Sequence, residues 1–549
     1  MEWSDYQQAI FDAVTHLQGS LLVEAVAGSG KTTTLVELIN RIPYGKKVIF
    51  LAFNKRIAEE LKSRVDQRKA QCRTLHSVGN TAWQQSIGFD GPAVIDGRKI
   101  NKIMDEGMSY PQRTKYAQMA KLIGLAKGAG IVPSTVSPEL QCFAGLAKDE
   151  DAVWKQIIDM YEIEGFTLEK ETWNEKKQRM DPPGAVDQTA LALARAVLVR
   201  SIENSKRVID FDDQLYMPVV TGVPFERFDV VLLDEAQDVN AMQCEIVSRL
   251  LAPGGRVIAV GDRHQAIYGF RGAMSESMDH IAERFDCKPF PLSVSYRCPK
   301  KVIEVARQYV KHIEAFDGTP DGLVEHCEGD EGYDIRLLRQ QDVILCRLNA
   351  PLVALAFWLI RQRIACRVLG RDIASGLTSL VKRMKAPDVD SLVRALSDYL
   401  KREAIRHEKD PAALSRAQDK VATLHVFIDE LAPSDTVQQL ISNIEGMFQD
   451  PAPGQAAIML TLSTVHKAKG LEWDRVFILD ATDLMPLPWA KPGWQMAQEV
   501  NLIYVAVTRA KRELRFISSM ALGDSQGQRG RTGGHGCRGR GTGRSAASR

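Results

Sequence analysis

The chain has 549 residues, of which 45% are hydrophobic and 26% are charged. These proportions are ordinary for a globular protein, and the length predicts several domains. The formal net charge is only +2, which excludes a strong overall positive field for a polyanionic partner. Any surface that binds nucleic acid must therefore be basic only locally.

Cysteine spacing and hydropathy argue against a structural metal site, a secreted protein and a membrane protein. The nine cysteines contain no C-x-x-C pair, which speaks against a structural zinc or iron–sulfur site and favours a reduced, cytoplasmic location. The N-terminal residues are too polar for a signal peptide. The most apolar run, at 351–360, is too short to span a bilayer. We therefore expect that the chain is not a membrane protein.

Short apolar runs indicate two groups of buried strands. The first group comprises 20–26, 47–53, 228–234 and 256–262, and the second comprises 342–346, 458–463, 475–480 and 514–518. Continuous rather than alternating hydrophobicity is typical of strands buried on both faces of a parallel sheet. With helical patterns between the runs, the sequence predicts an α/β fold with two doubly wound sheets.

Each group of strands is interrupted by a stretch that reads as an inserted helical subdomain. Within the second stretch, the segments 386–388 and 433–435 offer N-caps. The predicted organisation is a first α/β domain (1–84 and 201–280) with the insertion 85–200, and a second α/β domain (281–374 and 455–522) with the smaller insertion 375–454.

The last segment, 523–549, contains nine glycines and six arginines but no aromatic residue. It cannot bury a core, so it is expected to be disordered. Its role stays open between an arginine-rich tether for nucleic acid, a solvated tail and an out-of-frame coding remnant.

The stretch AVAGSGKTT (25–33) follows the first predicted strand and fits a phosphate-binding loop, with Ala25 in place of its first glycine. Backbone N–H groups of such a loop and the N-terminus of the following helix bind phosphate oxygens. We expect Lys31 to reach the β- and γ-phosphates of ATP and the hydroxyl of Thr32 to bind Mg²⁺. The predicted nucleotide contacts in the loop are Ala27, Gly28, Ser29, Gly30, Lys31, Thr32 and Thr33.

Two later strand ends carry residues suited to hydrolysis. In VVLLDEAQD (230–238), Asp234 can bind Mg²⁺ and Glu235 can orient and deprotonate the attacking water. After the strand that ends near 262, Gln265 is placed to contact the γ-phosphate or that water.

Aromatic side chains follow Gln265 closely along the chain. Tyr268 and Phe270 precede Arg271, and this group is a candidate grip on nucleic acid. The rings either belong to the core or stack on bases, and both readings stay open.

At these motifs the chain resembles the UvrD/Rep-type superfamily 1 DNA helicases, closest to their small F-box-helicase-like branch, although no F-box is evident. In that family alanine is normal at the position of Ala25. The stretch WSDYQQAI resembles the adenine-reading glutamine motif, which points to Gln7, with Gln8 as the alternative. The stretches LAFNKRIAEEL and TLHSVG resemble motifs that touch single-stranded DNA, and their candidate contacts are Phe53, Asn54, Lys55, Thr74 and His76.

Three motifs in the C-terminal half extend the resemblance. SVSYRCP implies that Tyr296 stacks on adenine and that Arg297 reaches the γ-phosphate. NLIYVAVTRAKREL implies that Arg509 is a second arginine finger. The motif STVHKAKGLEWDRV implies DNA contacts by Thr464 and His466 and nucleotide contacts by Gly470 and Glu472.

The resemblance implies two RecA-like P-loop domains that close on ATP and Mg²⁺. The implied activity is an ATP-dependent translocase and helicase that moves 3′ to 5′ on single-stranded DNA or tailed duplexes in repair, recombination or replication. A recombinase or a single-strand-binding protein is a further candidate partner. The small second insertion favours translocation over strong duplex separation. Two alternatives stay open: a motor that strips proteins from single strands, and a nucleotide-dependent binding switch.

Overall fold

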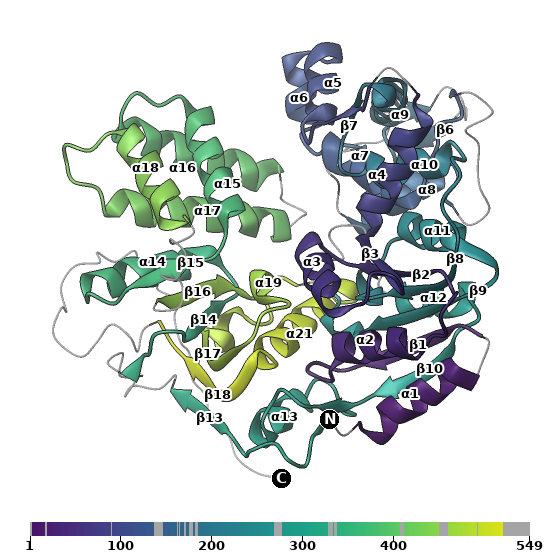
Figure 1. Cartoon of the computed structure of the whole chain (residues 1–549). Helices are drawn as coiled ribbons and strands as arrows, with labels where there is room; N and C mark the ends of the chain where they lie inside the picture. Colours follow the sequence, from purple (N-terminus) through teal and green to yellow (C-terminus); the bar gives the residue numbers. More distant parts are fainter. Residues whose placement is uncertain are drawn as a thin grey trace, which may run out of the picture.

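A computed structural model shows two α/β domains, each extended by a group of helices (Figure 1). The structure describes residues 3–16, 19–88, 91–136, 146–161, 163, 165–168, 172–174, 179–181, 185–267, 277–327, 333, 337–406, 411–449, 459–490 and 492–519. The predicted contacts Tyr268, Phe270 and Arg271 and the tail 523–549 lie outside the described residues.

The first domain is built on a parallel sheet with the strand order β10-β1-β9-β8-β2-β3. Its strands are β1 (Leu21–Ala25), β2 (Val48–Ala52), β3 (Ala70–Thr74), β8 (Phe228–Leu233), β9 (Leu251–Gly261) and β10 (Lys288–Leu292). The four predicted strands are confirmed as β1, β2, β8 and β9. Because all the strands are parallel, their carboxyl ends lie along one edge of the sheet, where ligands bind in folds of this class.

Side chains from alternate positions of these strands enter two different cores. Leu232 packs with α1 (Asp5–His16), α2 (Lys31–Arg41) and α3 (Lys55–Arg64). Its neighbours Val231 and Leu233 pack on the other face. That face is covered by α4 (Leu75–Ser86), α10 (Asp213–Val220), α11 (Ala241–Leu250), α12 (Ser277–Arg284) and the helices of the first insertion. The sheet is therefore doubly wound.

The first insertion is mostly helical, as predicted. Its helices are α5 (Lys99–Gly107), α6 (Tyr110–Lys115), α7 (Met119–Ala129), α8 (Asp151–Met160) and α9 (Gln188–Glu203). Short strand pairs join β4 (Val94–Ile95) to β7 (Val208–Ile209) and β5 (Thr172–Asn174) to β6 (Arg179–Asp181).

The second domain contains another parallel sheet, with the order β13-β18-β17-β14-β16-β15. Its strands are β13 (Leu323–Cys327), β14 (Val343–Cys346), β15 (Cys366–Val368), β16 (Leu460–Thr464), β17 (Trp473–Leu479) and β18 (Ala510–Ile517). The helices around it include α13 (Lys300–Ala306), α14 (Asn349–Arg361), α19 (Val465–Ala468), α20 (Ala481–Leu484) and α21 (Trp494–Val507). A short parallel pair, β11 (Val294–Ser295) with β12 (Glu314–Ala315), lies between the domains in the sequence.

In the described part of the second insertion, the helices are α15 (Arg371–Met384), α16 (Val389–Arg406), α17 (Pro411–Asp429) and α18 (Val437–Met447). Asp388 caps α16, since its Oδ1 atom accepts the N–H of Ser391 at 2.7 Å. The predicted cap at 433–435 is wrong. Asp435 instead accepts the N–H of Ala432 at 2.9 Å, and Thr436 caps α18.

The predicted domain boundaries at 84, 200, 280 and 374 fall within helices α4, α9, α12 and α15. Their exact positions stay predictions. Among the helices that the structure describes, none has the length and apolar character needed to cross a membrane.

The two domains share an apolar cluster at their interface. Val26, Ala27 and Ile267 from the first domain pack with Tyr504 and Val507 of the second. The phosphate-loop region therefore contacts the second domain directly, and this contact positions the site described next.

Candidate nucleotide and DNA site

The loop 25–33 connects β1 to α2 at the carboxyl edge of the first sheet. Ala25 is 4% exposed and ends β1, so its methyl group lies in the sheet rather than in the phosphate-binding part. Gly28 has a φ of 74°, and a Cβ there would lie 2.6 Å from Ser295 Oγ. The N–H of Tyr296 also donates to the carbonyl of Gly28 at 2.9 Å. Only glycine allows this close approach.

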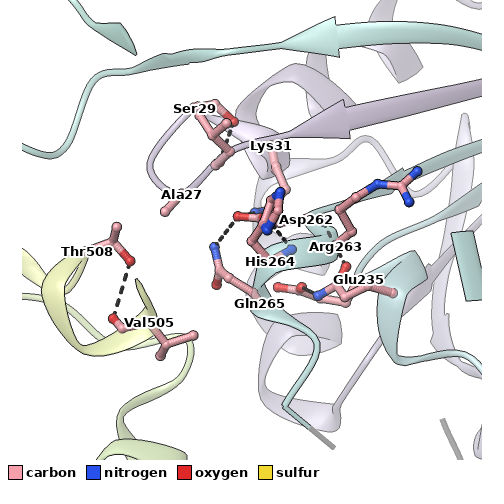
Figure 2. Close-up of polar contacts among 12 residues, drawn as sticks. Ala27, Ser29, Lys31, Glu235, Asp262, Arg263, His264, Gln265, Val505 and Thr508 are labelled. Atoms are coloured by element: carbon pink, nitrogen blue, oxygen red, sulfur yellow. Dashed lines mark hydrogen bonds and ion pairs between the residues drawn. The ribbon is translucent and has the colours of Figure 1, made fainter. Parts of the chain in front are cut away.

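Lys31 and Gln265 meet at Asp262, which directly follows β9 (Figure 2). Gln265 Nε2 donates to Asp262 Oδ2 at 2.7 Å, and Lys31 Nζ lies 3.9 Å from the same oxygen. Asp262 therefore fixes the amide of Gln265 beside the lysine that we expect to bind phosphate. Sequence reasoning assigned no role to Asp262.

The pKa values of the two acidic residues after β8, Asp234 and Glu235, are shifted in opposite directions. Asp234 is 4% exposed, and burial together with Glu235 raises the pKa of Asp234 to about 7. Burial also opposes ionisation of Glu235, but the cations Lys31 and Lys469 outweigh it and lower the pKa of that carboxyl. Glu235 is therefore ionised at neutral pH, as a general base must be.

The residues around Asp234 fit a magnesium ion. Burial disfavours the ionised form of Asp234 and also raises the pKa of Asp238 to about 6, although Lys469 opposes the second shift. A cation bound beside Asp234 would favour its ionised form. Mg²⁺ in nucleotide sites takes one or two protein oxygens and completes its shell with phosphates and water. The hydroxyl of Thr32 and the carboxylate of Asp234 can supply such oxygens. Among the described residues, no group of three or more His, Cys, Asp or Glu side chains could hold a metal ion alone.

Two arginines of the second domain reach this region. Arg509 directly precedes β18, is 1% exposed, and places Nη2 3.5 Å from Gln265 Oε1. Burial and the charge of Arg297 lower the pKa of Arg509 to about 10, so it remains a cation at neutral pH. Arg297 Nε lies 2.6 Å from Glu472 Oε2. Thus Glu472 contacts an arginine finger candidate, while Gly470 lies exposed two residues before it.

Gln7 and Tyr296, the two residues expected to contact adenine, lie side by side. Gln7 is 4% exposed; its Nε2 donates to Thr34 Oγ1 at 3.0 Å, and its Oε1 accepts the hydroxyl of Tyr296 at 3.4 Å. The ring of Tyr296 is 5.0 Å from that of Phe316. Gln8, in contrast, is exposed and donates to Asp12 at 2.7 Å. This geometry favours Gln7 over Gln8.

The DNA-contact candidates of the first domain follow β2 and β3. Phe53 is 36% exposed and the side chain of Lys55 is 88% exposed. Asn54 caps α3 by accepting the N–H of Ile57 at 2.9 Å, and Thr74 caps α4 by accepting the N–H of Ser77 at 3.1 Å. Burial lowers the pKa of His76, which favours its neutral form.

In the second domain, Thr464 ends β16 and His466 lies in α19. Thr464 is 8% exposed. These two residues and those after β2 and β3 share a location at carboxyl ends of strands, and their contacts with DNA stay predictions. Ser29 and Thr33 likewise remain predicted nucleotide contacts.

Sequence reasoning missed contacts that only the fold brings together. Lys469 Nζ lies 2.6 Å from Asp238 Oδ2 and donates to the carbonyl of Gln265 at 2.7 Å. Tyr504 accepts the N–H of Ala27 at 2.9 Å. Both residues lie inside recognised motifs, but contacts across more than 200 positions leave no signal in a single sequence.

Comparison with known families agrees with this arrangement. The UvrD/REP helicase N-terminal domain matches residues 6–286, and the UvrD-like helicase C-terminal domain matches residues 377–521. The chain belongs to the UvrD/REP helicase family. The resemblance predicted from the motifs and the fold class of two RecA-like domains are therefore confirmed. Membership supports DNA helicase activity and the use of ATP.

Several relatives match nearly the whole chain. The ATP-dependent DNA helicase UvrD2 of Mycobacterium tuberculosis is 26% identical over 94% of this chain and 79% of its own length. F-box DNA helicase 1 of Gallus gallus is 25% identical over 91% of this chain and 47% of its own. DNA helicase II of Escherichia coli is 23% identical over 92% of this chain and 83% of its own.

Proposed function

We propose that this UvrD/REP helicase is a 3′-to-5′ motor that hydrolyses ATP to ADP and phosphate to move along single-stranded DNA and to separate tailed duplexes. The observation that carries the proposal is the meeting of both domains at Gln265, which contacts Asp262 on one side and Arg509 on the other. The names of relatives, including an ATP-dependent DNA helicase, support the same activity. Repair, recombination or replication is the proposed setting.

In the proposed mechanism, each side chain acts on the γ-phosphate or on the attacking water. Lys31 binds the phosphates, and Gln265 orients the water. Glu235 accepts a proton from that water as it attacks. Arg297 and Arg509 neutralise charge that develops on the transferred phosphoryl group, which requires the domains to be closed. Mg²⁺ held by Thr32 and Asp234 would supply further charge neutralisation.

Movement of the DNA strand would follow from closure of the two domains, because the second domain supplies the arginines Arg297 and Arg509 that meet the phosphates only in the closed state. We expect the γ-phosphate to strengthen the contact of Arg509 with the first domain, so its loss on hydrolysis should weaken that contact and let the cleft open once per turnover. In the open state, Phe53 and His76 would hold the strand while Thr464 and His466 release it. In the closed state the two pairs would exchange these roles, so that the strand moves in one direction. The 3′-to-5′ direction rests on family resemblance.

Removal of proteins from single-stranded DNA is a second candidate function. The observation that favours it is the small second insertion, whose described helices α15 to α18 pack with α14 in one shared core. A recombinase or a single-strand-binding protein would then be the displaced partner.

The test compares DNA-stimulated ATP hydrolysis of the wild type with that of Lys31→Ala. Removing the lysine that binds the phosphates should lower turnover by about 10²-fold or more, while DNA binding measured by fluorescence anisotropy persists. Lys46→Ala is the control, because its side chain is 56% exposed and pairs only loosely with Asp229. Unchanged turnover in Lys31→Ala would refute the site, and a wild type without turnover would leave only a binding switch.

A further inference from the structure

The hydroxyl of Tyr504 lies at the centre of the interface between the two domains. Tyr504 belongs to α21 and is fully buried, with 0% exposure. Its oxygen accepts the N–H of Ala27 in the phosphate loop at 2.9 Å and lies 3.5 Å from Asp262 Oδ2. A single phenol from the second domain therefore contacts two parts of the ATP site in the first.

The direction of these two hydrogen bonds is fixed by chemistry. The Ala27 N–H can only donate, so Tyr504 accepts that bond and keeps its own proton for Asp262. Burial and the negative charge of Asp262 raise the pKa of the phenol, so this proton stays on the oxygen. Asp262 Oδ2 also accepts from Gln265 Nε2 at 2.7 Å. The phenol thus connects the phosphate loop to Gln265 through one carboxylate.

The same helix also fixes the position of the arginine finger candidate. Asn501, one turn before Tyr504, donates from Nδ2 to the carbonyl of Ala266 at 3.0 Å. Arg509, just after the helix, donates from Nε to the carbonyl of Val505 at 2.9 Å and places Nη2 3.5 Å from Gln265 Oε1. Figure 2 shows this end of the helix, at Val505 and Thr508, facing Ala27 and Gln265.

We propose that Tyr504 is a positioning residue for ATP hydrolysis. Its hydroxyl docks α21 on the phosphate loop and on Asp262, so that Arg509 and Gln265 take their places together when the domains close. The inference deepens the proposed function and rests on it. In this role the phenol acts through the phosphate loop and Asp262 rather than on the nucleotide, so its loss should affect the hydrolytic step more than nucleotide binding.

The experiment compares Tyr504→Phe with Tyr216→Phe. Both tyrosines are fully buried, and the hydroxyl of Tyr216 donates to the carbonyl of Ile131 at 2.7 Å, away from the site. Each variant loses one buried hydroxyl, so each should unfold at a lower temperature. Only Tyr504→Phe should lose about 10-fold in DNA-stimulated kcat, with the KM for ATP changed far less, because it leaves the Ala27 N–H without its partner.

A second readout does not depend on turnover. Hydrogen exchange of the peptide containing Ala27 should become faster in Tyr504→Phe and stay unchanged in Tyr216→Phe, since only the first variant removes the acceptor of that N–H. Equal kcat values for the two variants, or unchanged exchange at Ala27 in Tyr504→Phe, would overturn the inference. Absence of DNA-stimulated turnover in the wild type would overturn the proposed function instead, and the exchange result would still decide whether the contact exists.

Discussion

The two arginines of the second domain have different surroundings although both are finger candidates. Arg509 is buried against backbone carbonyls of its own domain and reaches Gln265. Arg297 is more accessible, with 23% of its side chain exposed, and pairs with Glu472. Because Arg509 is already held in place, its guanidinium would need little reorganisation to act as the proposed finger.

We predict that Arg509→Ala lowers kcat for ATP by about 10³-fold, the lower end of the range for arginine fingers. The affinity for ATP should fall much less, because the finger acts mainly in the transition state. Steady-state kinetics with saturating single-stranded DNA measure both quantities.

The control for this variant is Arg512→Ala. Arg512 lies three positions further on, is 74% exposed and sits 3.6 Å from Asp474, so turnover should stay near that of the wild type. An equal loss of ATP binding and of kcat in Arg509→Ala would indicate a structural role.

Much of the candidate site is predictable from the sequence because its residues follow apolar strands. Lys31, Asp234 and Gln265 each stand just after such a run, where a parallel sheet places ligand contacts. Tyr504 and Lys469 are not predictable in this way, since their partners lie in the other domain. The capping bonds of Asn54 and Thr74 are likewise not predictable from the sequence alone, because the same residue types suit DNA contacts equally well.

The short 3₁₀ turn η4 (Arg263–Gln265) faces the second domain, and its His264 ring lies near His312 and Tyr504 of that domain. The ring of His264 is 5.9 Å from that of His312 and 6.1 Å from that of Tyr504. Burial lowers the pKa of His264; His312 and Arg263 lower it further, whereas Asp262 and Glu24 raise it. The interface therefore favours the neutral imidazole.

This environment predicts a loss of stability in acid. Because the pKa of His264 is lower in the folded state, the folded protein binds fewer protons than the unfolded chain when the pH falls below the ordinary histidine pKa. The stabilisation by neutral His264 is therefore fully present above that pKa and is lost as the pH falls. The melting temperature of His264→Gln should therefore fall less than that of the wild type between pH 7.5 and pH 5.5.

His16→Gln is the matched control, because His16 is exposed at the end of α1. It should keep the pH dependence of the wild type. If His264→Gln keeps it as well, then protonation of this histidine does not weaken the interface.

The second insertion is attached to its domain through the N-terminus of α14. Asp419 of α17 accepts the backbone N–H groups of Asn349 and Ala350 at 3.0 and 2.9 Å, and the side-chain amide of Asn349 at 2.7 Å. A carboxylate at this position satisfies N–H groups of the first turn and interacts favourably with the helix dipole.

We predict that Asp419→Ala lowers the free energy of unfolding by about 1–2 kcal/mol, the cost of losing a helix cap. Urea denaturation followed by circular dichroism measures the change. Asp398→Ala, which removes a carboxylate that is 59% exposed, should change stability by less than about 0.5 kcal/mol. Equal stability of Asp419→Ala and the wild type would show that the insertion does not depend on this cap.

Strands at the edges of the sheets were harder to predict than those in the middle. The interior strands β2 and β14 are buried along their whole length, so each reads as an apolar run. The edge strands β3 and β10 are only partly buried, and β10 contains two prolines, which edges tolerate. The missed strands β13 and β15 occupy the edges of the second sheet.

One apolar cluster joins the two domains, and another joins the second domain to its insertion. The first contains Val26 and Ile267 together with Tyr504. The second spans α14, β16 and the helices α15 to α18. The phosphate loop, through Val26, and α19, which carries the predicted DNA contact His466, therefore border the same apolar cluster, whereas the insertion shares a core with its own domain.

In the proposed function, ATP hydrolysis drives directional movement on DNA. This coupling is tested most directly by strand separation on otherwise identical duplexes with a 3′ tail or a 5′ tail, each with ATP and with a non-hydrolysable analogue. We predict that strand separation needs hydrolysis and occurs on the 3′-tailed duplex. Separation of the 5′-tailed duplex alone, or equal separation with the analogue, would contradict it.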